Sequence, residues 1–209
     1  ITPGYTLPEL WPSIPHLFID RAARFPGRTL VARRELLPDG SRGAWRRLSF
    51  GEALGQSRAL TQALIDRGIG PEASVMVLSG GAPAHLVVNL AAQMARAPYA
   101  PLSVNYSLAG GDFARLRHCA DICRPRLVYA DDWRTFLPAM RALGEEHDLI
   151  LVTDEAAPGG ETLALGDLLA TVPTSAVDAS IAAITPDTHA KTIFTSGSTG
   201  KPKGVIQTQ

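Results

Sequence analysis

The chain has 209 residues, of which 45% are hydrophobic and 19% are charged, and its 20 basic residues balance its 20 acidic residues. This composition is typical of a globular protein, and it excludes a disordered chain and a general nucleic-acid binder. No run of about 18 apolar residues occurs, which excludes a transmembrane helix from the sequence.

The charges are distributed unevenly along the chain. The three lysines, Lys191, Lys201 and Lys203, all follow residue 190, and residues 188–209 contain no acidic residue. The preceding segment, residues 142–187, contains nine acidic residues and neither Lys nor Arg. The C-terminal segment is therefore locally positive in a chain whose net charge is zero.

The ends of the chain and its cysteines bear on its context. The chain begins at Ile1 rather than Met and stops at Gln209, directly after its most informative segment, so we expect it to be part of a longer protein. Its two cysteines, Cys119 and Cys123, are too few for a disulfide framework. They favour a reducing compartment, and we expect a cytoplasmic protein.

The first third of the chain predicts a helix, a hairpin and a second helix. Apolar residues recur at helical spacing over 15–25. Two strand-like runs, 29–36 and 44–50, flank a turn at 38–41 and predict a β-hairpin. Ser49 and Glu52 fit a capping box, which predicts a helix over about 50–67.

Beyond Pro71, strands and helices alternate. The patterns predict strands over 73–79, 126–130, 149–153 and 191–195, an extended piece over 99–102, and helices over about 83–96, 112–123 (with Asp112 as its N-cap) and 132–143. Residues 154–188 form a weak connector with at most one helix. The alternation implies an α/β fold with a mostly parallel sheet flanked by helices on both faces.

The segment after the strand 191–195 has the composition of a polyphosphate-binding loop. It contains glycines that allow tight turns, hydroxyl groups that can donate to phosphate oxygens, and two lysines that neutralise charge. These residues are Ser196, Gly197, Ser198, Thr199, Gly200, Lys201, Lys203 and Gly204. A further strand-like run follows at 205–208, so the loop joins two strands. The alternative is a surface hairpin without a ligand.

This loop is not a Walker A motif. Only two residues separate Gly197 from Gly200, and Pro202 follows Lys201 where that motif requires Ser or Thr and a helix. We therefore expect a flap that closes over phosphates rather than a rigid nest at a helix N-terminus.

The sequence TSGSTGKPKG over residues 195–204 resembles the phosphate-binding signature of the adenylate-forming superfamily, which includes acyl-CoA synthetases, luciferases and nonribosomal peptide adenylation domains. Residues 48–54 and 68–102 resemble earlier segments of that superfamily, and residues 101–132 look most like feruloyl-CoA synthases. Two departures occur. Thr192 replaces a bulky aliphatic residue, and Ala97-Pro98 replaces the usual Gly-Ala.

The resemblance assigns roles to the loop residues. It implies that the β- and γ-phosphates of ATP contact the loop between Ser196 and Gly204, with Lys203 as the family-wide phosphate contact and our catalytic candidate. Lys201 stands at a variable position. Thr195 resembles a position that helps to hold Mg²⁺. We also count it among the predicted nucleotide-binding residues.

The resemblance also implies a reaction. Residues 1–209 would be the N-terminal part of an AMP-binding large domain in an acid–CoA ligase. The ligase would use ATP, Mg²⁺ and coenzyme A to activate a small carboxylic acid, such as the hydroxycinnamic acid ferulate, through an acyl-adenylate. The remaining machinery would follow Gln209, so we expect the 209 residues alone to be inactive. The alternatives are an adenylation domain that loads a carrier protein and a non-catalytic nucleotide-binding module. The sequence does not indicate an oligomeric state.

The histidines and thiols form no recognisable catalytic or metal-binding motif in the sequence. His118, Cys119 and Cys123 lie on one predicted helix and offer a metal half-site, but the chain has no second cysteine pair, which favours packing thiols. His85 and His147 have no partner acid or nucleophile recognisable in the sequence. We expect each to be a helix-surface residue or a satisfied polar residue rather than a base.

Overall fold

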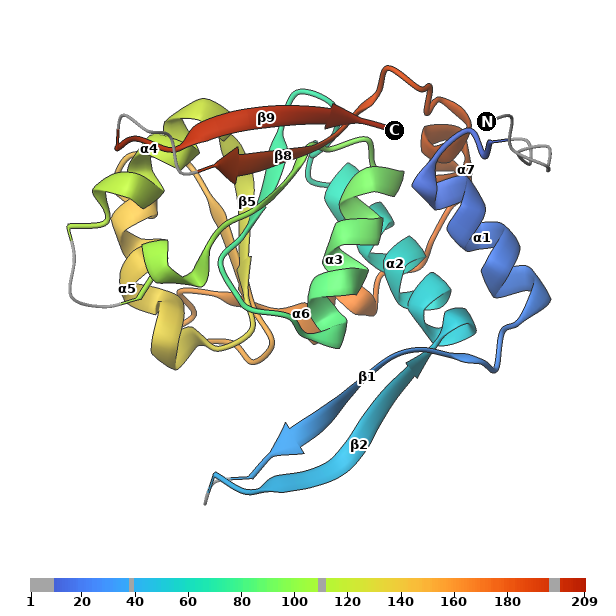
Figure 1. The fold of residues 1–209 in the computed structure, drawn as a ribbon, viewed down its shortest axis with the longest axis horizontal. Helices are drawn as coiled ribbons and strands as arrows, with labels where there is room; N and C mark the ends of the chain where they lie inside the picture. The colour runs from blue at the N-terminus through green and yellow to red at the C-terminus, as the bar shows by residue number, and fades with distance from the viewer. Residues whose placement is uncertain (1–9, 38–39, 109–111, 196–199) are drawn as a thin grey trace, which may run out of the picture.

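The computed structural model describes residues 10–37, 40–108, 112–195 and 200–209, and these residues form a central sheet of seven strands (Figure 1). The spatial order is β7-β6-β5-β3-β4-β8-β9. The strands are β3 (Ser74–Val77), β4 (Tyr99–Pro101), β5 (Pro125–Ala130), β6 (Ile150–Thr153), β7 (Leu163–Ala164), β8 (His189–Thr195) and β9 (Lys203–Thr208). Neighbouring strands are parallel except β8 and β9, which pair antiparallel. The predicted α/β fold with a mostly parallel sheet is confirmed.

Helices cover both faces of this sheet. They are α1 (Ile14–Arg24), α2 (Phe50–Ile65), α3 (Pro83–Met94), the short 3₁₀ helix η1 (Val104–Tyr106), α4 (Ala114–Cys123), α5 (Trp133–Gly144), α6 (Leu165–Leu169) and α7 (Ser175–Ala182).

The alternation of side chains along each strand divides the core into two layers. On β3, Val75 and Val77 contribute to the layer that contains α1, α2, α3, α6 and α7. Met76, which lies between them, contributes to the layer that contains α4 and α5. All three are fully buried, so the sheet is apolar on both faces, as a mostly parallel sheet requires.

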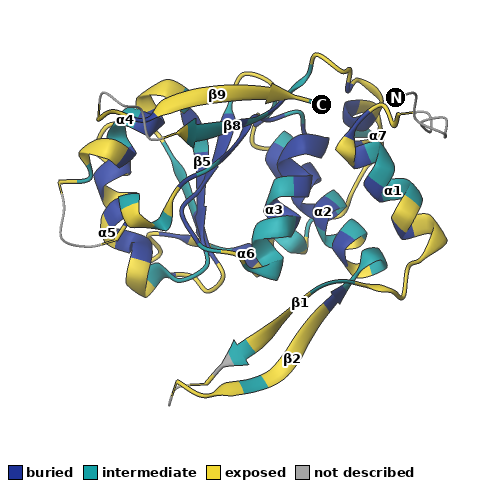
Figure 2. Cartoon of the chain, in the orientation of Figure 1, coloured by how far each residue is buried: buried dark blue, intermediate teal, exposed yellow. Residues whose placement is uncertain are grey.

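A separate antiparallel hairpin, β1 (Thr29–Leu36) and β2 (Arg42–Ser49), projects from this body (Figure 1). Most of β2 is exposed (Figure 2). Arg33 and Arg46 lie opposite each other. Arg46 pairs with Glu35 at 3.0 Å, and Arg33 reaches Asp131 at 3.8 Å. Both arginines therefore belong to ordinary surface ion pairs.

Local sequence signals locate the first helices closely. The Ser49–Glu52 capping box is present, with the Glu52 carboxylate 2.8 Å from the Ser49 amide, and α2 ends at Ile65. This bonding lowers the pKa of Glu52. The helix α1 ends at Arg24, so Phe25 lies beyond it and is 44% exposed rather than part of its apolar face.

Two predictions about later elements are wrong. The N-cap of α4 is Phe113 in the left-handed region, with φ of 53°, and not Asp112. Asp112 still accepts a bond from the Ala114 amide at 3.0 Å. Residues 154–188 contain β7, α6 and α7, where at most one helix was expected.

Long-range bonds explain why the connector folds. Gln62 on α2 accepts from both the amide and the hydroxyl of Thr174, at 2.9 and 2.8 Å. Arg58, also on α2, pairs with Asp178 at 2.7 Å, and Ser180 donates to the Met94 carbonyl at 2.8 Å. These partners are distant in sequence, so local pattern cannot reveal them.

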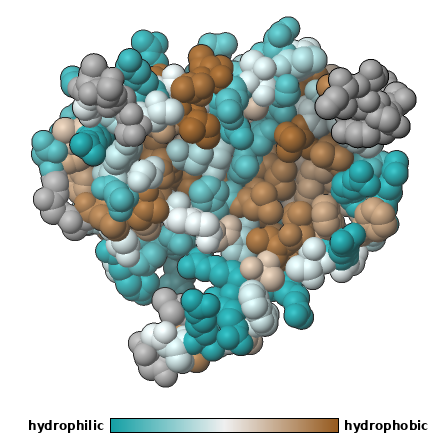
Figure 3. Space-filling model, in the orientation of Figure 1, coloured by the Kyte–Doolittle hydropathy of each residue, from teal (hydrophilic) through white to brown (hydrophobic). Residues whose placement is uncertain are grey.

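Figure 3 shows apolar areas on the molecular surface, among them one over α3 and one over β9. On β9, Val205 and Ile206 are 46% and 64% exposed. Within the described ranges, no helix combines the length and the apolar content needed to cross a bilayer.

We predict that Leu64→Ala lowers the free energy of unfolding by about 2–5 kcal/mol, because it leaves a cavity in the larger core layer. Leu64 is 1% exposed and belongs to that layer. Urea denaturation measures the change. The control is Val172→Ala, at a position that is 77% exposed, which should change stability by less than about 0.5 kcal/mol. Equal effects of the two substitutions would contradict this description of the core.

Candidate functional site

The candidate site is built on the β8–β9 hairpin. β8 is parallel to β4, so it leaves the sheet at the carboxyl edge, where ligands bind in open α/β folds. The last pair of the antiparallel ladder is Thr195 with Lys203. The loop between these two residues therefore begins and ends at adjacent points on the sheet edge.

Part of the predicted loop lies outside the described residues. This part comprises Ser196, Gly197, Ser198 and Thr199, for which the flap and the phosphate contacts stay predictions. The structure describes the return of the loop through Gly200, Lys201 and Pro202. Gly200 has a φ of +88°, a conformation that L side chains rarely adopt.

Two lysines stand at the end of this hairpin. Lys201 and Lys203 are exposed, whereas Pro202 between them is buried. No carboxylate of the described residues lies within 4.0 Å of either ammonium group. Two cations without acidic partners can neutralise an anion that approaches the carboxyl edge of the sheet.

Thr195 is the predicted Mg²⁺ contact. Its side chain is at the exposed end of β8, and its Oγ1 donates to the Lys203 carbonyl at 3.5 Å. This weak bond leaves the hydroxyl oxygen able to accept or to ligate. A single neutral oxygen is a modest donor, but Mg²⁺ usually keeps water and phosphate ligands, so the residue fits that role.

The helix α4 supports the hairpin from one face of the sheet. The Nε2 atom of His118 lies 2.9 Å from the Pro202 carbonyl oxygen, across 84 residues of sequence. One helical turn further, the Cγ2 atom of Ile122 lies 3.4 Å from the position that a Cβ on Gly204 would occupy. Sequence reasoning considered His118 only with the nearby thiols, and nothing in the sequence signals its contact with Pro202.

The thiols on α4 are packing groups. Cys119 is buried in the core layer beneath α4 and α5, and both cysteines are free. Burial raises the pKa of Cys119 to about 12. Burial also raises the pKa of Cys123 to about 11, although a hydrogen bond with Thr192 opposes this rise. The burial of these thiols suits the predicted packing role.

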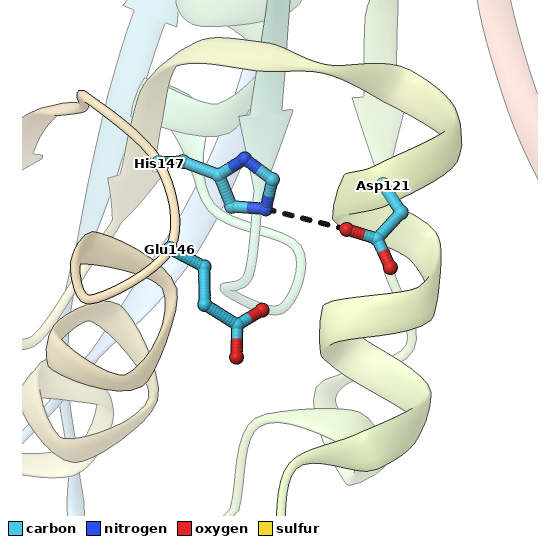
Figure 4. Close-up of side chains that lie close together, drawn as sticks. All are labelled: Asp121, Glu146 and His147. Carbon is cyan, nitrogen blue, oxygen red and sulfur yellow. Dashed lines mark ion pairs between the residues drawn. The ribbon is translucent and has the colours of Figure 1, made fainter.

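A cluster of potential metal ligands lies between α4 and the residues that follow α5 (Figure 4). Ligand atoms of Asp121, Glu146 and His147 all lie within 4.8 Å of one another. His147 Nε2 lies 3.7 Å from a carboxylate oxygen of Asp121, which makes an ion pair when the imidazole is protonated, and among the described residues this nitrogen has no hydrogen-bond partner. Arg117 pairs with Glu145 at 3.3 Å and with Glu146 at 3.0 Å. The cluster is thus a set of ion pairs that joins α4 to the end of α5.

His85 also has a defined environment. Its Nδ1 atom lies 3.0 Å from the Gly80 carbonyl oxygen, and its Nε2 atom contacts the Tyr99 hydroxyl. Burial raises the pKa of that hydroxyl well above its ordinary value. His85 is therefore a satisfied polar residue at the start of α3, as the sequence predicts.

A model of the family described as AMP-binding enzyme matches residues 18–209. Nonribosomal peptide synthetase 32 of Fusarium pseudograminearum is 30% identical over 159 residues, which are 76% of this chain and 2% of that protein. Tyrocidine synthase 1 of Brevibacillus parabrevis is 23% identical over 194 residues, which are 93% of this chain and 15% of that protein. The chain thus spans only a small part of these relatives.

Solved structures share the fold at low sequence identity. A benzoate CoA ligase from Burkholderia xenovorans LB400 superposes with a TM-score of 0.69 at 17% identity, covering 93% of this chain and 34% of the ligase. A fatty acyl-adenylate ligase from L. pneumophila superposes with a TM-score of 0.67 at 16% identity, covering 95% of this chain and 30% of that one.

We predict that Gly204→Ala destabilises the hairpin by about 1–3 kcal/mol through overpacking. A Cβ at this position would lie 3.0 Å from Thr192 Cγ2. Thr192→Ser removes that methyl group and keeps the hydroxyl, which lies 3.0 Å from His189 Nε2. The double variant should therefore recover much of the loss in thermal or urea unfolding. If the two substitutions were simply additive, the contact would not be the cause.

Proposed function

Because the chain belongs to the AMP-binding enzyme family, we propose that it forms the phosphate-binding part of a ligase that activates a carboxylic acid with ATP. The observation that carries this proposal is the pair of lysines at the end of the β8–β9 ladder, both exposed and both without an acidic partner among the described residues. We propose residues 1–209 as the N-terminal part of the large domain of that enzyme.

In the proposed first step, an oxygen of the acid attacks the α-phosphorus of ATP. A new phosphorus–oxygen bond forms, the bond to the bridging oxygen breaks, and pyrophosphate leaves. Negative charge then accumulates on the leaving group, and stabilising this charge matters more than acid or base catalysis. Lys203 supplies a fixed positive charge beside the end of β8, and Lys201 adds a second charge nearby.

The loop residues between the two strands complete the proposed binding set. Ser196, Gly197, Ser198, Thr199 and Gly200 would offer hydroxyl and amide donors to the β- and γ-phosphates. The Thr195 hydroxyl would provide one oxygen ligand to Mg²⁺, which would neutralise part of the phosphate charge. Gly204 belongs to this set as the residue that lets β9 lie close to β8.

In the proposed second step, a thiol displaces AMP from the acyl-adenylate. We propose coenzyme A as the acceptor and an aromatic acid, such as a hydroxycinnamic acid, as the substrate. The similarity of residues 101–132 to feruloyl-CoA synthases supports this choice. The shared fold with a structure described as a benzoate CoA ligase is compatible with it.

A second candidate is an adenylation domain that loads the thiol of a carrier protein. The curated relatives favour it, because they include nonribosomal peptide synthetases. Acyl transfer in the full-length protein distinguishes the two. Incubation with ATP, a panel of aromatic acids and amino acids, and either coenzyme A or a phosphopantetheinylated carrier protein shows which thiol becomes acylated.

We predict that Lys203→Ala in the full-length protein lowers the rate of acid-dependent ATP–pyrophosphate exchange by about 100-fold or more, as loss of a group that stabilises a developing charge does. The control is Lys191→Ala, at the opposite end of the same hairpin, where Lys191 pairs with Gln207. This variant should stay within about twofold of the parent protein.

The comparison of these two lysines also tests the third possibility, a non-catalytic nucleotide-binding module. Such a module would show no exchange in the parent protein, and Lys203→Ala would affect only nucleotide affinity. Equal exchange rates in the two lysine variants would contradict the role that we assign to Lys203.

A further inference from the structure

The hydrogen bond between His118 and Pro202 connects a well-packed helix to the described end of the phosphate loop. His118 lies in the middle of α4, whose buried residues Leu116 and Cys119 belong to the core layer on that face of the sheet. Its Nε2 atom is 2.9 Å from the Pro202 oxygen. A carbonyl oxygen can only accept, so Nε2 carries the proton and donates.

Fixing this oxygen also fixes the residue that follows. The peptide unit is planar and includes the Pro202 carbonyl together with the amide nitrogen and Cα of Lys203. A donor that holds the oxygen therefore sets the orientation of the whole plane. Because Lys203 also pairs with Thr195, its backbone is held from α4 on one side and from β8 on the other.

No other described residue supplies this support. Pro202 is buried and has no amide hydrogen, and it precedes the first residue of the β9 ladder. Without His118, its carbonyl would lose its donor. The contact of Ile122 with the Gly204 position, one turn along α4, places the same helix face against β9.

We propose that His118 is a positioning residue, which aims the Lys203 side chain at the phosphates by holding the Pro202–Lys203 peptide. This inference rests on the proposed function, since it assigns a role within that site. His118 does not itself touch the nucleotide in this proposal, and its effect passes through Lys203.

The experiment compares three substitutions in the full-length protein. The amide nitrogen of a glutamine can take the place of His118 Nε2, whereas an asparagine is shorter and cannot reach the carbonyl. We expect His118→Ala and His118→Asn to lower kcat for ATP–pyrophosphate exchange by about tenfold, the scale of one lost hydrogen bond, with little change in the KM for ATP. His118→Gln should restore most of the rate. Arg115→Ala, at an exposed position on the same helix, is the control.

Combination with Lys203→Ala tests the route of the effect. If His118 acts through Lys203, adding His118→Ala to Lys203→Ala should lower the rate no further. Additive losses would overturn the proposal. It would also be overturned if His118→Ala left the rate unchanged, or if all three His118 variants lost activity equally with a lower melting temperature, which would show a merely structural role.

A second readout needs no catalysis. Hydrogen exchange of peptides covering residues 200–208, measured without nucleotide, should accelerate in His118→Ala and His118→Asn but not in His118→Gln. Unchanged hydrogen exchange in His118→Ala would show that the His118–Pro202 hydrogen bond does not hold this segment, and would overturn the proposal. Absence of ATP–pyrophosphate exchange in the parent protein would instead refute the proposed function. The two failures are therefore distinguishable.

Discussion

The register of the β8–β9 ladder is the constraint on which the site depends. Side chains alternate between the two faces of a strand, so a slip of one residue would move Lys203 to the opposite face of the sheet. Gly204 pairs with Phe194 in this register, and a Cβ on Gly204 would approach the Thr192 methyl group to 3.0 Å. The smallest residue of β9 thus permits the close approach of the two strands in the register that pairs Lys203 with Thr195.

The second support of the site comes from the core. α4 is anchored through residues that are fully buried, and this leaves its other side chains free to contact the hairpin. Two of these side chains do so: His118 contacts Pro202 in the loop, and Ile122 lies beside Gly204 on β9. A helix that packs against several strands is thereby connected to a loop at the edge of the sheet, and core packing determines the geometry of the candidate site.

Sequence reasoning succeeded where the signals are local. The Ser49–Glu52 capping box spans four residues, and both its bonds are present. It failed where the decisive contacts are distant. The helix α7 is short, and its contacts with Arg58 and Gln62 on α2 arise only in the folded chain. The bond of His118 to Pro202 spans 84 residues and follows no pattern of spacing, so the loop could be recognised from its composition while its support could not.

The structure explains how the unevenly distributed charges are paired. The acid-rich segment directly precedes the lysine-bearing hairpin, and in an unfolded chain it could neutralise the loop. In the folded chain six of its nine acids pair with arginines instead. Such pairs join Arg58 to Asp178, Arg117 to Glu145 and Glu146, Arg126 to Asp148, Arg134 to Glu155, and Arg141 to Glu161.

Exposed ion pairs of this kind add little to stability, typically about 0–1 kcal/mol each. Their larger consequence is electrostatic, because they hold these acidic side chains beside arginines and away from the lysines of the hairpin. Lys201 and Lys203 have no ion-pair partner among the described carboxylates, although the chain is neutral overall. The fold therefore leaves two cations together at the end of the hairpin, which is what the proposed phosphate site requires.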